Sequence, residues 1–174
     1  MAPTGGATIW LTGLPSSGKS SLARAIEERA AALGQPCRLL DGDELRRTIS
    51  ADLGFSPSDR AEQARRASRL AREEASTGVL AIAALVSPYA ADREAARRQH
   101  EQAGLRFLEV FVATPLAECE RRDPRGLYAA ARAGEIEDVT GVTAPYEPPE
   151  RPELTVHPDE SPHDAAGRVL AHLA

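Results

Sequence analysis

The residues with the clearest chemical potential lie near the start of the chain, in the stretch GLPSSGKSS at 13–21. This stretch follows the apolar run 7–12 and contains Lys19, the only lysine among 174 residues. Glycines at this spacing let successive backbone N–H groups face the phosphates of a nucleotide, and a helix that begins there adds a positive dipole. A compact ammonium on a long stem reaches such phosphates where a planar guanidinium would not fit. The pattern G-x-x-x-x-G-K-[ST] therefore predicts a phosphate-binding loop.

In this interpretation the loop binds ATP, mainly through its backbone. Lys19 contacts the β- and γ-phosphates, and the hydroxyl of Ser20 is a ligand of Mg²⁺. The alternative is a glycine-rich turn capped by serine, but an apolar strand before the motif and a helical pattern after it favour the nucleotide site. The loop residues predicted to bind ATP are Gly13, Leu14, Pro15, Ser16, Ser17, Gly18, Lys19, Ser20 and Ser21.

Two carboxylates follow the second apolar run, in the stretch LLDGDELRR. Asp41 and Asp43 flank a glycine at the end of a predicted strand beside the phosphate-binding loop. One carboxylate can hold Mg²⁺ or its waters, a role we assign to Asp41, and the other can orient an acceptor hydroxyl as a base. The alternative is a pair of acids that the helix dipole stabilises at a helix start. Proximity to the loop favours catalytic roles for both.

Arginines accumulate just beyond this turn, at positions 46, 47, 60, 65 and 66. Such a cluster is normally a solvated helix face. In a chain with a formal charge of −5, however, local basic clustering favours a phosphate or sulfate on a second substrate, which arginine forks suit. The net negative charge argues against a nucleic acid polymer or an anionic membrane as partner.

A parallel α/β sheet is the architecture that would bring these residues together. Apolar runs predict strands over 7–12, 37–40, 79–86, 106–112 and 154–157. Helical spacing and start signals predict helices over 20–33, from 56–59 onward, from 87–88 to about 102, over 115–122, near 127–132 and after 161–164. Alternating strands and helices favour one α/β domain over 1–174, in which ligands bind at the carboxyl ends of the strands.

The stretch 123–152 differs from the rest because it is rich in Gly, Pro, Arg and Glu and has little periodicity. A long irregular stretch inside a compact domain is usually functional. We interpret residues of about 121–150 as a lid segment. Arg121, Arg122 and Arg125 are candidates to neutralise the transferring phosphoryl group, and Arg121 and Arg125 are assigned to the ATP site.

The sequence resembles adenylyl-sulfate kinases. The resemblance rests on the stretches GLPSSGKSS, DGDELR, LGFSPSDRAEQARR, LVSPYAADR, RDPRGLYAAARAGEI and VTGVTAPYEPP, which follow the family's order as far as about Pro149. It implies the three-layer fold of P-loop NTPases with a parallel sheet of roughly five strands. It also implies a kinase of sulfate assimilation that uses ATP and Mg²⁺ to phosphorylate the 3′-hydroxyl of adenylyl sulfate, and a homodimer.

The resemblance further implies roles for individual residues around the acceptor. Arg46 and Arg60 match arginines that bind the sulfonucleotide, and Phe55 matches an aromatic ring that stacks on its adenine. Asp41 and Asp43 match the acidic pair near metal and acceptor. The residues assigned to the acceptor site are Asp43, Arg46, Phe55, Arg60, Gln63, Ser87, Arg125 and Val139.

Ser87 matches a serine that is described as a phosphoserine intermediate in some relatives, and it completes a catalytic set with Lys19, Asp41 and Asp43. Direct in-line transfer from ATP to a hydroxyl needs no covalent step. The structural alternative is that Ser87 caps a helix that begins with Pro88. Proximity of Ser87 to the substrate is expected in either case.

Several positions depart from the family pattern near the acceptor. The family usually has asparagine where this chain has Gln63, and a phenylalanine that closes over adenine where it has Val139. It usually has an acid where this chain has Ala144, and lysine where it has Arg125. The loss of one stacked ring is worth about 1–3 kcal/mol. Two alternatives therefore stay open: a P-loop phosphotransferase with a different acceptor, and a non-catalytic sulfonucleotide-binding protein. A GTPase switch is excluded because its N-K-x-D motif would need a second lysine.

The remaining sequence features predict the cellular setting. Cys37 and Cys119 lie far apart and match no metal or redox pair, so both are expected to be reduced. The first ten residues lack a basic segment followed by a long apolar core, and no apolar run approaches membrane-spanning length. These features predict a soluble cytoplasmic protein without a signal peptide.

Overall fold

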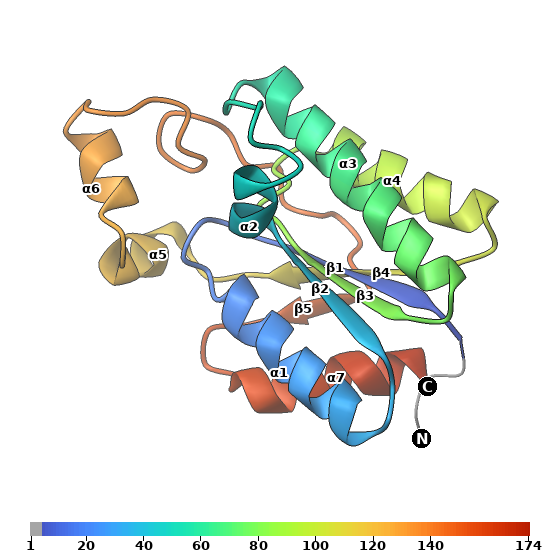
Figure 1. Cartoon of the computed structure of the whole chain (residues 1–174). Helices are drawn as coiled ribbons and strands as arrows, with labels where there is room; N and C mark the ends of the chain where they lie inside the picture. The colour runs from blue at the N-terminus through green and yellow to red at the C-terminus, as the bar shows by residue number, and fades with distance from the viewer. Residues whose placement is uncertain (1–4) are drawn as a thin grey trace.

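The computed structural model describes residues 5–174, and a parallel five-stranded sheet of order β2-β3-β1-β4-β5 lies at the centre of this region (Figure 1). The strands are β1 (Ala7–Thr12), β2 (Cys37–Asp41), β3 (Leu80–Ala84), β4 (Arg106–Val112) and β5 (Leu154–Val156). The strand predictions were therefore correct in number and order. The expectation about a signal peptide concerns in part residues 1–4, which lie outside the described residues.

Helices cover both faces of this sheet, which gives the three layers that were expected (Figure 1). The helices are α1 (Lys19–Ala32), α2 (Gly42–Arg47), α3 (Pro57–Ser76), α4 (Ala90–Gln102), α5 (Leu116–Arg122), α6 (Leu127–Arg132) and α7 (Pro162–Leu173). Helices α1 and α7 lie side by side on one face, and α3 and α4 cover the other. Within residues 5–174, no helix combines the length and the apolar character that crossing a membrane would need.

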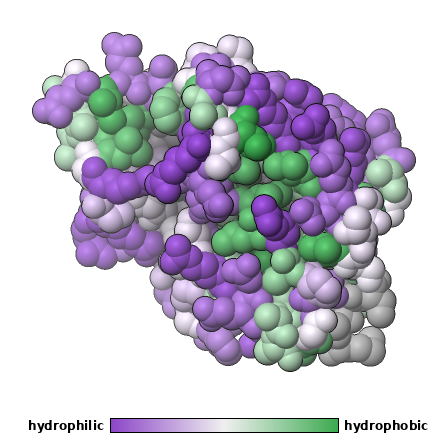
Figure 2. Space-filling view, in the orientation of Figure 1, coloured by the Kyte–Doolittle hydropathy of each residue, from purple (hydrophilic) through white to green (hydrophobic). Residues whose placement is uncertain are grey.

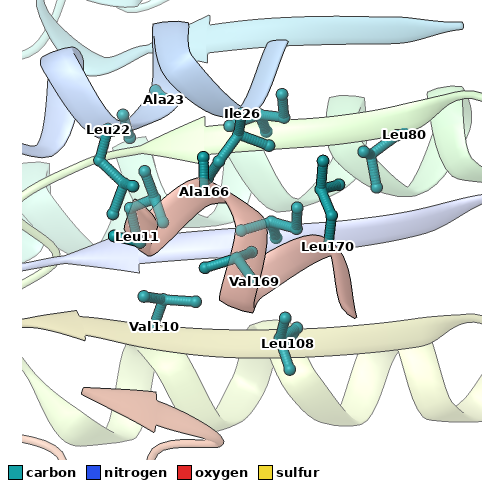
Figure 3. Close-up of a cluster of buried hydrophobic side chains, with 14 of the residues drawn as sticks. Leu11, Leu22, Ala23, Ile26, Leu80, Leu108, Val110, Ala166, Val169 and Leu170 are labelled. Carbon is teal, nitrogen blue, oxygen red and sulfur yellow. The ribbon is translucent and has the colours of Figure 1, made fainter. Parts of the chain in front are cut away.

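The apolar core lies on both sides of β1, because this strand is buried along its whole length. Leu11 points toward α1 and α7, where it belongs to the cluster that contains Ile26 and Val169 (Figure 3). Trp10 points to the opposite face and packs in a cluster with Ala67 of α3. Alanines on α3 allow that helix to approach the sheet closely. A strand covered on both faces reads as a continuous apolar run, which is why β1 was predictable.

Two helix starts have the local chemistry that their sequence indicated. The hydroxyl of Ser56 accepts a hydrogen bond from the backbone N–H of Asp59 at 3.2 Å, and Pro57 is the first residue of α3. The same arrangement begins α7, where the hydroxyl of Ser161 accepts from the N–H of Asp164 at 3.1 Å. In both cases a serine cap followed by proline satisfies and fixes the first turn.

The prediction that Ser87 caps a helix starting at Pro88 is wrong. Helix α4 begins at Ala90 with Tyr89 at its cap position, and β3 ends at Ala84 rather than at residue 86. Ser87 has a left-handed backbone (φ 38°), and its hydroxyl accepts a hydrogen bond from the buried indole Nε1 of Trp10 at 3.0 Å. A buried indole N–H needs such a partner. The Ser87 hydroxyl therefore bonds Trp10 and does not cap α4.

The irregular stretch 123–152 contains α6 and adds a small apolar cluster beside the sheet. This cluster, the lid core, consists of Cys119, Tyr128, Ala131 and Val139. Helices α5 and α6 project beyond the carboxyl ends of the strands, on the side where the phosphate-binding loop lies (Figure 1). The short helix near 127–132 was predicted correctly.

Candidate active site

A cavity of about 400 Å³ lies at the carboxyl ends of β1, β2 and β3. Hydrophilic residues predominate on the face where the α5–α6 side of the molecule meets the α2–α3 side (Figure 2). The predicted site residues that line the cavity are Ser16, Ser17, Gly18, Lys19, Ser20, Ser21, Asp41, Asp43, Arg46, Phe55, Arg60, Gln63, Ser87 and Arg125. The structure thus brings together residues that the sequence spreads over more than a hundred positions.

The phosphate-binding loop (residues 13–21) needs its two glycines for different reasons. A Cβ on Gly13 would lie 2.7 Å from the backbone oxygen of Val112, so the loop passes too close to β4 for any side chain there. Gly18 has φ 104°, a left-handed conformation that side chains disfavour, and it caps the start of α1. The helix N-terminus with its positive dipole therefore opens into the cavity.

Lys19 occupies the base of this loop. Its Nζ donates to the backbone oxygens of Gly13 at 2.9 Å and Leu14 at 2.7 Å, and only 8% of the residue is exposed. Burial is the largest cause that lowers the pKa of Lys19, to about 8, although Asp43 and Asp41 favour the charged form. A phosphate in the cavity would meet this ammonium among backbone N–H groups.

Ser20 and Asp41 form a pair of oxygen donors at the cavity wall. The hydroxyl of Ser20 donates to Oδ2 of Asp41 at 2.9 Å. Oδ1 of Asp41 accepts from the backbone N–H groups of Asp43 at 3.0 Å and Glu44 at 3.3 Å, which caps α2 and fixes the carboxylate. Hydroxyl and carboxylate oxygens suit Mg²⁺, which usually keeps waters and substrate phosphates as its other ligands. Within the described residues no cluster of three or more His, Cys, Asp or Glu suits a metal.

Asp43 faces the lid segment across the cavity. Its Oδ2 lies 3.0 Å from Nη1 of Arg125, and both side chains are more than half exposed. Exposed ion pairs of this kind contribute at most about 1 kcal/mol, so substrates can compete with it. The Asp43 carboxylate is therefore available to an acceptor hydroxyl.

Phe55 presents an exposed ring between two guanidinium groups. The Cζ of Arg46 lies 4.1 Å from the ring centroid and that of Arg60 lies 5.5 Å from it, while 52% of Phe55 is exposed. Arg60 Nε also donates to the Phe55 backbone oxygen at 3.0 Å, which fixes the loop before α3. Burial first, and then the charge of Arg60, lowers the pKa of Arg46. Concentrated positive charge beside an aromatic ring suits an anionic nucleotide.

Gln63 and Ser87 also line the cavity. Gln63 Nε2 donates to the backbone oxygen of Gly42 at 3.0 Å and so braces the turn between Asp41 and Asp43. Ser87 lines the cavity, with its hydroxyl engaged by Trp10. Both residues therefore lie where substrates would be enclosed.

Some predicted residues do not line the cavity. Val139 is buried in the lid core, and Arg121 is 73% exposed at its side chain and bonds Glu118 at 2.6 Å. Gly13, Leu14 and Pro15 form the outer part of the loop rather than the cavity wall.

Arg122 lines the cavity, whereas Arg121, which was predicted to bind ATP, does not. Nη1 of Arg122 lies 3.4 Å from the backbone oxygen of Ser17. Cys119 is the buried residue of α5, and a residue three positions later lies on the same side of a helix. The burial of Cys119 could therefore have indicated that Arg122, rather than Arg121, faces inward. The arginines at 65 and 66 both pair with Glu62 on α3, so that part of the basic cluster is a surface ion-pair group.

Comparison with known proteins gives consistent results. The model of the family described as adenylylsulphate kinase matches residues 5–157. The chain is 49% identical over 168 residues to the bifunctional enzyme CysN/CysC of Mycobacterium tuberculosis, which covers 97% of this chain and 27% of that relative. It therefore spans about a quarter of the length of that bifunctional relative. It is 44% identical over 165 residues to the adenylyl-sulfate kinase of Saccharomyces cerevisiae, covering 95% of this chain and 82% of that protein.

A solved structure is also similar over nearly the whole fold. It is the Mycobacterium tuberculosis APS kinase CysC in complex with AMPPNP and APS, with a TM-score of 0.94, 48% sequence identity and 98% of each chain covered. The likeness includes the phosphate-binding loop, the central sheet and the lid segment.

Proposed function

The chain belongs to the adenylylsulphate kinase family, and from this premise we propose that it phosphorylates the 3′-hydroxyl of adenylyl sulfate with ATP. The products are 3′-phosphoadenylyl sulfate and ADP. The observation that carries the proposal is a continuous cavity in which the phosphate-binding loop faces Asp43, Arg46 and Phe55. The similar mycobacterial structure with AMPPNP and APS supports the same pair of ligands here.

The donor half of the cavity holds the triphosphate. Backbone N–H groups of the phosphate-binding loop and the N-terminus of α1 surround it, and Lys19 binds the β- and γ-phosphates. Ser20 and Asp41 would hold Mg²⁺, which would supply positive charge to the phosphates during transfer. Arg122 and Arg125, which line the lid side of the cavity, stabilise the charge on the transferring group.

The acceptor half orients the sulfonucleotide. Phe55 stacks on the adenine, and Arg46 and Arg60 bind the anionic phosphosulfate through guanidinium groups. Asp43 accepts the proton of the 3′-hydroxyl as that oxygen attacks the γ-phosphorus. Ser87 encloses the substrate as part of the wall and forms no covalent intermediate.

The departures from the family pattern bear on which acceptor is used. Among the residues that line the cavity, Phe55 is the one aromatic side chain, and Val139 is not in the lining. This arrangement favours weaker binding of the adenine rather than a different reaction, because Arg46 and Arg60, which would bind the phosphosulfate, both lie beside Phe55.

The acceptor is tested by ADP release with MgATP and a panel of alcohols. We expect turnover with adenylyl sulfate and much slower release with adenosine 5′-phosphate, which lacks the sulfate, or with sugars. Rapid turnover with another acceptor and none with adenylyl sulfate would establish the divergent phosphotransferase instead.

The rival hypothesis of a non-catalytic binder predicts no ADP release from the native chain, and the same assay tests the role of Asp43. We expect Asp43→Ala to lower turnover by at least about a hundredfold, the lower range for loss of a general base, and to change the affinity for MgATP little. Glu94→Ala, which removes one exposed carboxylate on α4, is the matched control for altered surface charge. Equal turnover of Asp43→Ala and the native chain would remove Asp43 from the mechanism.

Assembly and location follow from the same family. We propose a homodimer that acts in the cytoplasm. A relative described as a hexameric APS kinase from Thiobacillus denitrificans, 31% identical to this chain, supports self-association in the family. Light scattering during gel filtration tests the assembly, and a monomer at micromolar concentration would contradict it.

A further inference from the structure

The outer side of the phosphate-binding loop is held by side chains from other parts of the chain. Oη of Tyr128 donates to the backbone oxygen of Pro15 at 2.7 Å, and Oγ1 of Thr114 donates to the backbone oxygen of Ser17 at 2.7 Å. The exposed fraction is 1% for Tyr128 and 5% for Thr114. Neither residue lines the cavity, so these hydroxyls act on the loop and not on a substrate.

The geometry of the peptide bond gives these contacts a consequence inside the cavity. In a trans peptide the carbonyl oxygen and the following N–H point in opposite directions. Tyr128 holds the Pro15 oxygen on the outer side, which directs the N–H of Ser16 to the inner side. Thr114, together with Nη1 of Arg122 at 3.4 Å, holds the Ser17 oxygen and so orients the N–H of Gly18. Ser16 and Gly18 both line the cavity, where these N–H groups would donate to the phosphate oxygens of a bound nucleotide.

Ser16 makes this restraint necessary. Its φ of 61° lies in the left-handed region, which residues with a side chain rarely adopt. Such a conformation persists where the surrounding structure fixes it. The peptide that enters Ser16 is the one whose oxygen Tyr128 binds. Without this bond, the loop would be free to relax toward backbone angles that turn the Ser16 N–H out of the cavity.

Tyr128 is itself held firmly by the lid segment. It belongs to the lid core, against which Leu14 of the phosphate-binding loop also packs. Its backbone N–H donates to Oδ1 of Asp123 at 3.1 Å, which fixes the start of α6. Burial, followed by the influence of Cys119, raises the pKa of Tyr128, so the hydroxyl keeps the proton that it donates.

We propose that Tyr128 is a positioning residue for ATP, which holds the Pro15–Ser16 peptide so that the Ser16 N–H faces the phosphates. The inference rests on the proposed function as far as the nucleotide is concerned, and it does not depend on the acceptor. It gives the lid segment a direct part in shaping the donor site.

The test compares the affinity of MgAMPPNP for Tyr128→Phe and for the native chain by titration calorimetry. We expect the dissociation constant to rise about threefold to tenfold, the range for one lost hydrogen bond, while that of adenylyl sulfate stays within twofold. Tyr146→Phe is the matched control, because the Tyr146 hydroxyl shares a hydrogen bond with the hydroxyl of Thr12 at 2.9 Å and does not bond the loop backbone. We expect Tyr146→Phe to leave the affinity for MgAMPPNP within twofold, and Thr114→Val to weaken it as Tyr128→Phe does.

A double-mutant cycle separates positioning from general stability. Glycine adopts the left-handed region freely, so Tyr128→Phe should weaken binding less in a Ser16→Gly background than in the native one. An equal loss in both backgrounds, or an equal loss in Tyr146→Phe, would overturn the proposal. Native protein that binds MgAMPPNP but does not phosphorylate adenylyl sulfate contradicts the proposed acceptor, and the Tyr128 comparison then still decides this inference.

Discussion

Lys19 lies in a buried site that disfavours its charged form. Burial lowers the pKa of Lys19 from 10.5 to about 8, and backbone oxygens of the loop partly replace water around Nζ. Between these two values the unfolded chain binds more protons at this residue than the folded chain does. The contribution of Lys19 to folding stability therefore increases as pH rises from about 8 toward 10.5. A triphosphate beside Nζ favours the charged form and raises the pKa again.

Binding of MgATP should therefore be accompanied by proton uptake above pH 8. We expect about half a proton or more to be taken up per site at pH 8.5, and distinctly less at pH 7, where Lys19 is already mostly charged. Calorimetric titrations in buffers of different ionisation enthalpy measure this uptake, with pH 7 as the internal control. Uptake that is the same at both pH values would contradict a depressed pKa at Lys19.

At the scale of residues, spacing along the chain was enough to predict the cluster of Lys19, Ser20 and Asp41. Lys19 and Ser20 begin the helix that follows the buried β1, and Asp41 is the last residue of the edge strand β2, so the ends of these two strands set their positions. Arg121, predicted at the ATP site, does not line the cavity, because neighbouring residues lie about 100° apart around a helix and α5 turns Arg122 toward the cavity instead. Val139 lies in a stretch without periodicity, so its burial in the lid core depends on contacts that no local pattern describes.

At the scale of elements, a buried arginine joins the segments that border the acceptor side. Arg93 of α4 bonds Glu109 of β4 at 2.9 Å, the backbone oxygen of Ser87 at 2.7 Å and that of Glu147 at 2.6 Å. Arg93 is 3% exposed and Glu109 is 9% exposed, so the pair is shielded from water. The arginine thus holds the strained turn at Ser87 and the end of the lid segment on the same helix.

Removing this arginine should destabilise the fold much more than removing a surface one. We expect Arg93→Met, which keeps much of the stem, to cost about 3 kcal/mol, the low end for a broken buried pair, because Glu109 keeps only the more distant Arg97, whose Nη2 lies 3.6 Å from its Oε2. Arg98→Ala, in an exposed pair with Glu94 on the same helix, should cost less than about 1 kcal/mol. Urea unfolding of both variants measures the difference. Equal losses would show that the buried pair contributes no more than a surface pair.

The order of strands and helices was predictable because β1 and β3 are almost wholly apolar runs and two helices carry serine–proline starts. The same serine–proline pattern was misleading at Ser87, where the indole of Trp10 requires the hydroxyl. Helix α2 was missed as an element, since its six residues are too few for a periodic pattern. A tertiary contact decided the first case, whereas a local cap by the Asp41 side chain begins α2.

At the scale of the whole molecule, the lid segment is in direct contact with the phosphate-binding loop. Leu14 packs against the lid core, Tyr128 bonds Pro15, and Arg125 reaches Asp43 across the cavity. Ligands that fill the cavity should therefore stabilise the lid segment as well as the loop, because binding to the native state alone opposes local unfolding.

Limited digestion with trypsin tests this coupling. The lid segment offers exposed arginines such as Arg121, Arg125 and Arg132. We expect MgADP together with adenylyl sulfate to slow cleavage at these sites about tenfold or more at concentrations well above the dissociation constants. Cleavage at Arg24, which faces solvent on α1, serves as the reference. Unchanged protection of the lid sites by saturating ligands would contradict a lid role.

Direct transfer within the cavity is tested most directly by a single turnover with ATP labelled at its γ-phosphate, with protein in excess, Mg²⁺ present and adenylyl sulfate added. Asp43 and Lys19 line the same cavity, and the Ser87 hydroxyl is bonded to Trp10. We therefore predict that the label moves into 3′-phosphoadenylyl sulfate without passing through the protein. Label that reaches only water, or that appears first on Ser87, would contradict this mechanism.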